Sequence, residues 1–96
     1  MADIKLISSG KREIKSLVEA ALTNESRLLE AGVHQTERRL KEFEHKYQMV
    51  TQEFVSRYEN DEFIETLDFD EWIGEYRILE RLREKTETLK DIRFAN

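Results

Sequence analysis

Residues 22–47, LTNESRLLEAGVHQTERRLKEFEHKY, decide the fold of this 96-residue chain. Along this stretch, apolar or small residues recur at alternating intervals of four and three, which is the spacing of a coiled-coil seam. The positions are Leu22, Ser26, Leu29, Val33, Thr36, Leu40, Phe43 and Tyr47. A helix with such a stripe has to bury it against another element. The spacing therefore predicts a long amphipathic helix and a second helix that lies along it.

The stripe continues toward the N-terminus through Ile14 and Val18, so the predicted helix spans residues 11–47. Such a helix is roughly 55 Å long, too long for a compact domain of this size unless another helix lies along it. Gly32 interrupts good helix formers and marks either a close helix crossing or a tolerated weak point. Residues 1–10 hold no pair of strands, so we expect them to form a flexible arm.

Downstream, the pattern predicts a short helix over residues 51–59 and a long one over residues 68–92. Thr51 is a suitable N-cap for the short helix, and the long helix has a candidate start at Asp68 or Asp70. The apolar stripe of the long helix consists of Phe69, Trp72, Ile73, Tyr76, Leu79, Leu82, Thr86, Leu89 and Ile92.

Two long helices with a short helical connection fold most simply as an antiparallel hairpin. The predicted fold class is therefore all-α, with a single helical domain over residues 11–96. We expect Leu29, Val33, Leu40 and Phe43 to be buried against Leu79, Leu82 and Leu89.

The second long helix is shorter than the first, so the hairpin leaves the N-terminal half of the first helix uncovered. Its apolar residues are Ile14, Leu17, Val18, Leu22, Leu28 and Leu29. Monomers rarely expose a patch of this kind. We therefore expect a homodimer or a hetero-oligomer formed through this half.

Composition narrows the classes of function. The chain carries 16 basic and 21 acidic residues, a net charge of −5, and no cysteine. A chain without cysteine has no disulfide framework and no thiolate metal site. No apolar run approaches the length of a membrane span, and no signal peptide is evident. We expect a cytoplasmic protein that does not engage a membrane, and the net acidity argues against general nucleic-acid binding.

Motifs for metal binding or catalysis are weak. Glu42 and His45 have the Glu-x-x-His spacing of di-iron helix bundles, but in a single copy. His34 and His45 are about 16 Å apart along a helix and cannot share a metal ion. The chain has no nucleophile elbow and no glycine-rich phosphate loop. We expect no metal, no other cofactor and no enzymatic activity.

The stretch from Glu59 to Tyr76, ENDEFIETLDFDEWIGEY, gives the chain its acidic character. It holds eight acids and no basic residue, and without these acids the net charge of −5 becomes +3. Aromatic anchors surrounded by acids suit a basic protein surface, and the acids would repel phosphates. The predicted partner-binding residues are Tyr58, Glu62, Phe63, Asp68, Asp70, Glu71, Trp72, Glu75 and Tyr76. Alternatively, the aromatic residues are core and the acids mark the start of a helix.

Three segments resemble a known group of small helical proteins from archaea and cyanobacteria, which are encoded beside putative toxins of the TumE type. These segments are LLEAGVHQTERRLKEFEHKYQM (28–49), FVSRYEND (54–61) and LDFDEWIGEYRILERLREK (67–85). The resemblance covers residues 26–96 and carries no catalytic residue. The resemblance implies an antitoxin that binds and blocks a toxin. It also implies that this toxin cleaves RNA. The alternative function is a structural coiled-coil adaptor or homodimeric scaffold subunit with no inhibitory role.

Overall fold

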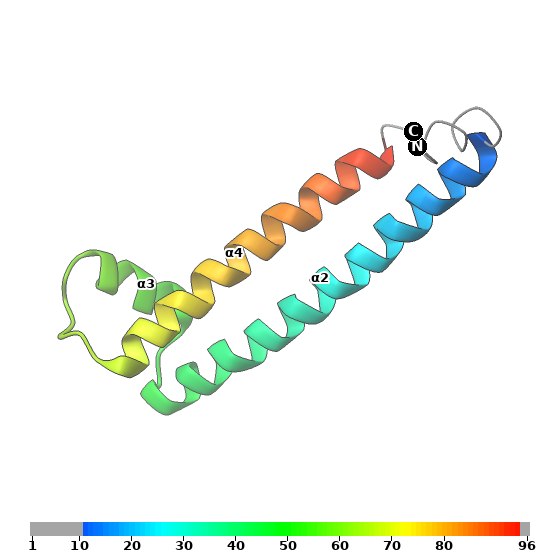
Figure 1. The fold of residues 1–96 in the computed structure, drawn as a ribbon. Coiled ribbons are helices and arrows are strands. Elements are labelled where there is room, and N and C mark those ends of the chain that lie inside the picture. The colour runs from blue at the N-terminus through cyan, green and yellow to red at the C-terminus, as the bar shows by residue number, and fades with distance from the viewer. Residues whose placement is uncertain (1–10, 95–96) are drawn as a thin grey trace.

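A computed structural model of the chain describes residues 11–94, which contain three helices and their connections. The helices are α2 (Lys11–Tyr47), α3 (Thr51–Glu59) and α4 (Leu67–Phe94). Helices α2 and α4 run antiparallel, and α3 packs beside them at the closed end of the hairpin (Figure 1). The predicted all-α hairpin is confirmed, and the predicted helix bounds agree to within two residues. The predicted arm, residues 1–10, lies outside the described residues.

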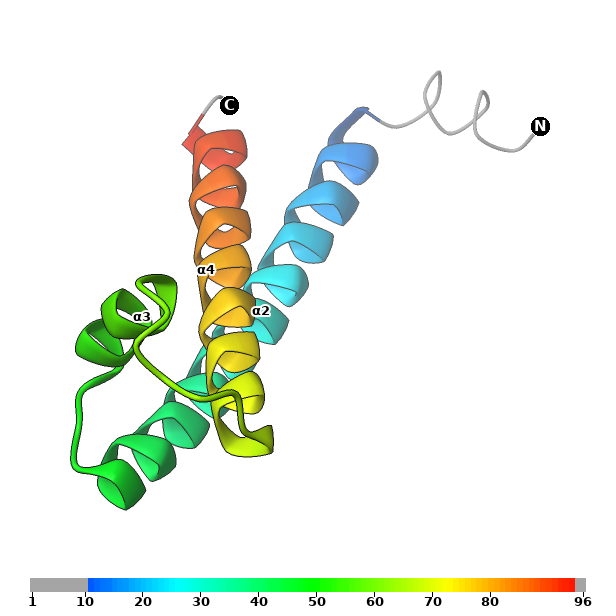
Figure 2. The same cartoon turned by 90° about the vertical axis from the view of Figure 1, so that its left-hand side faces the viewer.

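The molecule is elongated, with extents of 61 × 24 × 21 Å. Seen from the side, α2 and α4 cross near the closed end and diverge toward the start of α2 and the end of α4 (Figure 2). We call the end where they cross the closed end and the end where they diverge the open end. This divergence leaves the first turns of α2 without the full cover that α4 gives to the rest of the helix.

Helix α2 ends where Gln48 adopts a left-handed backbone conformation, with φ of 49°. The Gln48 side-chain amide donates to the carbonyl of His45 at 2.7 Å, and the N–H of Met49 donates to the carbonyl of Glu44 at 3.2 Å. These bonds satisfy carbonyl groups that the end of a helix leaves without partners. The chain can therefore turn sharply into α3.

The start of α3 corrects the prediction that Thr51 is an N-cap. The N-cap residue is Val50, whose side chain makes no capping hydrogen bond. The N–H of Thr51 instead donates to the carboxylate of Glu44 at 2.7 Å, and its hydroxyl accepts a hydrogen bond from the indole of Trp72 at 3.1 Å. A carboxylate at this position also suits the positive end of the helix dipole.

Helix α4 is capped by Thr66, upstream of the predicted starts at Asp68 and Asp70. The N–H of Phe69 donates to the Thr66 hydroxyl at 3.1 Å, and the N–H of Asp70 donates to the Thr66 carbonyl at 2.9 Å. Asp68 and Asp70 lie within the first turn, where negative charge is favourable.

The core is concentrated at the closed end. Phe54 of α3 and Trp72 of α4 are fully buried and stack face to face, with ring centroids 3.9 Å apart. Phe43, Tyr47 and Phe69 surround this pair, and Leu40, Val55, Ile73 and Leu79 complete the buried cluster. The predicted burial of Leu29, Leu40 and Leu79 is confirmed, whereas Val33, Phe43, Leu82 and Leu89 are half-buried.

Gly32 marks a close crossing of α2 and α4, which is one of its two predicted roles. A Cβ atom at this position would lie 3.2 Å from Cδ1 of Leu82. The missing side chain therefore lets Leu82 approach the backbone of α2.

Candidate functional site

Three of the predicted partner-binding acids form ion pairs within the protein. Asp68 pairs with Lys46 at 2.6 Å, Glu75 with Arg39 at 2.9 Å, and Glu62 with Arg57 at 3.1 Å. The first two pairs join α4 to α2, and the third holds the loop after α3 to that helix. These carboxylates contribute to the fold before any partner is bound.

Asp68 has two hydrogen-bond partners on α2. It accepts hydrogen bonds from the Lys46 ammonium and from the Tyr47 hydroxyl. These two bonds, that of Lys46 first, lower the pKa of Asp68 below its usual value. The same contact with Asp68 raises the pKa of Tyr47. The carboxylate thus fixes the last turn of α2 to the first turn of α4.

The prediction that Trp72 contacts a partner has to be corrected. Its side chain has no exposed surface, and its indole N–H already donates to Thr51 inside the protein. Tyr58 and Phe63 are half-buried and pack against Phe54, with ring centroids 5.6 and 5.5 Å away. The alternative interpretation holds for these aromatic rings, because they form or border the core.

Tyr76 lies at the edge of the core. It is half-buried, and its hydroxyl donates to Glu80 one turn along α4 at 3.2 Å. Burial, followed by the charge of Glu80, raises the pKa of this phenol. Tyr76 is therefore only partly accessible to a partner.

The exposed apolar surface of the acidic stretch lies instead on Ile64 and Leu67, which are 87% and 78% exposed. Glu65, Asp70 and Glu71 are also exposed, and none of the three forms an ion pair with another residue of the 11–94 range. Leu67, Asp70 and Glu71 are spaced to share one face of α4. We call these five residues the loop surface.

The sequence-based prediction missed Ile64 and Leu67. Both residues fall outside the helical stripes, and a helical period identifies only apolar residues that repeat along one face. The signal that could have identified them is an apolar residue that lies among acids and does not belong to the apolar stripe of a helix.

The loop that carries Ile64 is held in place by contacts of the residues just before it. Asp61 adopts a left-handed backbone conformation with φ of 56°, and its N–H donates to the carbonyl of Tyr58 at 3.1 Å. The Phe63 ring packs 4.9 Å from that of Phe69, and the Arg57 guanidinium lies 4.7 Å from the Phe63 ring centroid. Ile64 follows directly after this anchored residue.

A second candidate site is a groove of about 730 Å³ between α2, the start of α3 and α4. Its apolar lining includes Leu40, Leu79 and Val50, of which Val50 is 60% exposed. No motif in the sequence points to this groove, because its lining comes from three segments that only the fold brings together.

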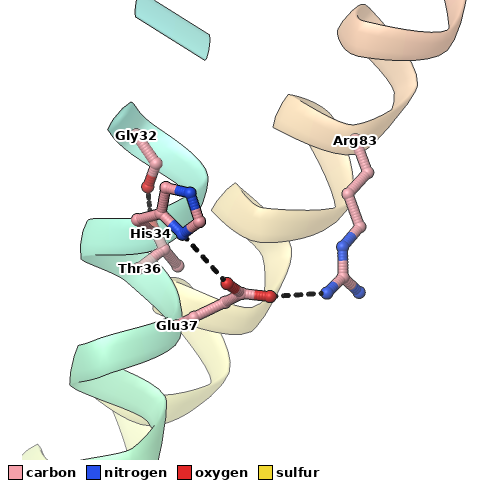
Figure 3. Close-up of polar contacts among 5 residues, drawn as sticks. All are labelled: Gly32, His34, Thr36, Glu37 and Arg83. Atoms are coloured by element: carbon pink, nitrogen blue, oxygen red, sulfur yellow. Dashed lines mark hydrogen bonds and ion pairs between the residues drawn. The ribbon is translucent and has the colours of Figure 1, made fainter. Parts of the chain in front are cut away.

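One rim of the groove is an ion-pair network that joins the two long helices (Figure 3). The carboxylate of Glu37 lies 3.1 Å from Arg83 of α4 and 3.7 Å from the imidazole of His34. The Thr36 hydroxyl donates to the carbonyl of Gly32 at 2.8 Å, rather than to the imidazole. The ion pair between Glu37 and Arg83 holds α2 to α4 along this side of the groove.

Neither a metal site nor a membrane span is found in the described part of the chain. Over residues 11–94, no three His, Asp or Glu side chains are grouped as ligands for a metal ion. In the same range, no helix combines the length and the apolar character needed to cross a bilayer.

Comparison with known proteins adds no assignment: no family model, curated protein or solved structure matches the chain.

Proposed function

We propose that this chain is a cytoplasmic antitoxin that binds a basic toxin through the loop surface. The observation that carries the proposal is the exposure of Ile64 and Leu67 together with three acids, Glu65, Asp70 and Glu71, that have no ion-pair partner within residues 11–94. The resemblance of residues 26–96 to antitoxin-like proteins supports the same function. We propose no enzymatic activity for the chain.

The chemistry of the loop surface suits such a partner. Exposed apolar side chains provide the desolvated centre that most protein interfaces need, and charged residues at the edge speed the encounter. An RNA-cleaving toxin has to present positive charge to the phosphates of its substrate, and Glu65, Asp70 and Glu71 would complement that charge. Because Phe63 anchors the loop, less conformational entropy is lost on binding.

In this proposal Trp72 positions the loop surface and does not touch the partner. Its stacking with Phe54 holds α3 against α4, and the loop that carries Ile64 joins these two helices. The contact role that the sequence suggested for Trp72 passes to Ile64 and Leu67.

The first experiment is copurification of the tagged full-length chain from its own cells, followed by mass spectrometry. The expected result is a basic protein that arrests growth when it is expressed alone. With that protein in hand, Ile64→Asp and Leu67→Asp should each weaken binding by about 2 kcal/mol, or roughly thirtyfold in Kd. The control is Val50→Asp, which changes an exposed apolar residue outside the loop surface. Equal loss of binding in the control would contradict the assigned surface.

Charge reversal tests the electrostatic part of the proposal. Asp70→Lys and Glu71→Lys should slow association and reduce its dependence on salt, with a smaller effect on dissociation. Glu84→Lys reverses an exposed acid on the same helix outside the acidic stretch and should leave the association rate nearly unchanged. Identical rates for all three variants would refute electrostatic steering by this surface.

The alternative function, a homodimeric coiled-coil scaffold, is favoured by a different observation. At the open end, Leu17, Val18 and Leu28 of α2 are 64%, 48% and 61% exposed. This surface lies on another part of the chain from the loop surface. Self-association and partner binding are therefore compatible in one molecule.

A further inference from the structure

One face of α2 is exposed, uncharged and regularly spaced. Its members are Leu17, Ala21, Asn24, Leu28 and Ala31, which follow one another at intervals of four, three, four and three residues. All five are exposed, and the two leucines are 64% and 61% exposed. This spacing is that of a coiled-coil seam, and we call the five residues the outer seam.

The outer seam is distinct from the stripe that faces α4. Leu29 belongs to the α4-facing stripe and is 5% exposed, whereas its neighbour Leu28 is 61% exposed. Helix α3 lies at the far end of α2, beside the closed end of the hairpin (Figure 1). Neither α3 nor α4 covers the outer seam.

The order of large and small residues identifies the partner. From Leu17 to Leu28 the outer seam reads large, small, small, large, and this order is the same in both chain directions. An interface between identical copies related by a two-fold axis needs such self-complementarity. We propose that the outer seam binds the outer seam of a second copy in antiparallel orientation. Leu17 then packs against Leu28 of the second copy, and Ala21 packs against Asn24.

Charge on the flanks of the outer seam is compatible with this register. In an antiparallel pair, each flank faces the equivalent flank of the other copy. Arg27 then lies opposite Ala20 of the second copy, and Glu25 lies opposite Val18, so that no like charges meet. Farther along, Glu13 faces His34, whose side chain is 74% exposed.

The lack of charge on the outer seam disfavours other classes of partner. A basic toxin or a nucleic acid would find no charged group on the outer seam to pair with. A second copy of this chain is the occupant that fits.

Sedimentation equilibrium of the full-length chain tests self-association directly. At tens of micromolar we expect a species of twice the 11.5 kDa chain mass. Leu17→Asp and Leu28→Asp should each weaken the dimer at least tenfold with unchanged helicity, because both positions are exposed in the single chain. Leu67→Asp, an equivalent change on the loop surface, should leave the dimer intact. A monomeric wild-type chain, or equal dissociation of the Leu67→Asp variant, would overturn the proposal.

Cysteine cross-linking tests the register, and the background is clean because the chain has no cysteine. An oxidised mixture of Leu17→Cys and Leu28→Cys chains should form a disulfide-linked heterodimer. Neither variant should cross-link with itself, since equal positions are about 16 Å apart in the antiparallel pair, beyond disulfide reach. Self-linked homodimers of each variant would show a parallel pair and refute the proposed register.

These tests do not depend on the proposed antitoxin activity. The outer seam variants should still bind the toxin, and the loop surface variants should still dimerise. Each proposal can therefore fail without the other.

Discussion

The two ends of the hairpin differ in how they bury their apolar side chains. At the closed end, three helices meet around the stacked rings of Phe54 and Trp72, both without exposed surface. At the open end, the two long helices diverge (Figure 2). Leu29 of α2 is also buried, but it does not belong to the aromatic cluster. The difference lies in the source of stability: the aromatic core belongs to the closed end, whereas both ends leave apolar side chains exposed, Ile64 and Leu67 at the closed end and Leu17 and Val18 at the open end.

The largest loss of stability is expected when the ring at the centre of the closed end is removed. Trp72→Ala should destabilise the protein by about 3–5 kcal/mol, because it removes the largest buried side chain and its contacts with Phe54 and Phe43. Urea denaturation followed by circular dichroism measures the change. A cost below about 1 kcal/mol would show that the aromatic cluster is not the main source of stability.

A matched pair of substitutions on α2 compares the two ends directly. Leu40 and Leu29 are buried to nearly the same degree, at 6% and 5% exposed, but only Leu40 belongs to the aromatic cluster. Leu40→Ala should cost about 4 kcal/mol and Leu29→Ala about 2 kcal/mol, since the diverging open end can close around a smaller side chain. Denaturation at a concentration where the chain is monomeric gives both values. Equal costs would remove the distinction between the ends.

Sequence reasoning was effective for the long helices and weak at the places where they meet. The stripe through Leu29, Leu40 and Tyr47 predicts helix α2 and its bounds because a period of 3.6 residues repeats over many turns. The caps at Val50 and Thr66 were missed, because Glu44 replaces the cap of α3 from seven residues away and Thr66 competes with two nearby aspartates.

The sequence predicted the negative charge of the candidate site but not which of its side chains are exposed. Acids and aromatic residues alternate along the same stretch, and one sequence does not say which of them face inward. Trp72 is core, and Asp68 and Glu75 are paired with Lys46 and Arg39. The exposed members, Ile64 and Leu67, become evident only when the fold shows that no helix covers them.

The two glycines of the long helices differ in how closely other side chains pack against them. A Cβ atom added at Gly74 would have no neighbouring atom within 4 Å, so Gly74→Ala should stabilise α4 by about 1 kcal/mol through helix propensity. Gly32→Ala gains the same propensity but has to displace Leu82, whose Cδ1 would be 3.2 Å from the new atom. The second variant should therefore be less stable than the first. Thermal denaturation decides, and equal stabilisation would show that the crossing at Gly32 is loose.

The smallest effect expected is the acid sensitivity of the closed end. Because hydrogen bonds from Lys46 and then Tyr47 lower the pKa of Asp68, folding favours the ionised carboxylate. Its contribution is complete above the usual carboxyl range and is lost as the pH falls through the lowered pKa. Asp68→Asn should therefore lower Tm slightly at pH 7 and flatten the fall in Tm on further acidification.

Glu65→Gln is the control for Asp68→Asn, since it also removes one negative charge but from a side chain without an ion-pair partner among residues 11–94. The control should keep the acid-induced fall in Tm that Asp68→Asn flattens. If both variants flattened the fall equally, the loss of net charge would explain the acid sensitivity. The contact between Asp68 and Lys46 would then have no special part in fixing the last turn of α2 to the first turn of α4. If only Asp68→Asn flattens the fall in Tm, the ionisation of this one carboxylate makes the stability of the closed end depend on pH. Among the ion pairs of the described residues, the open end has no counterpart to this contact.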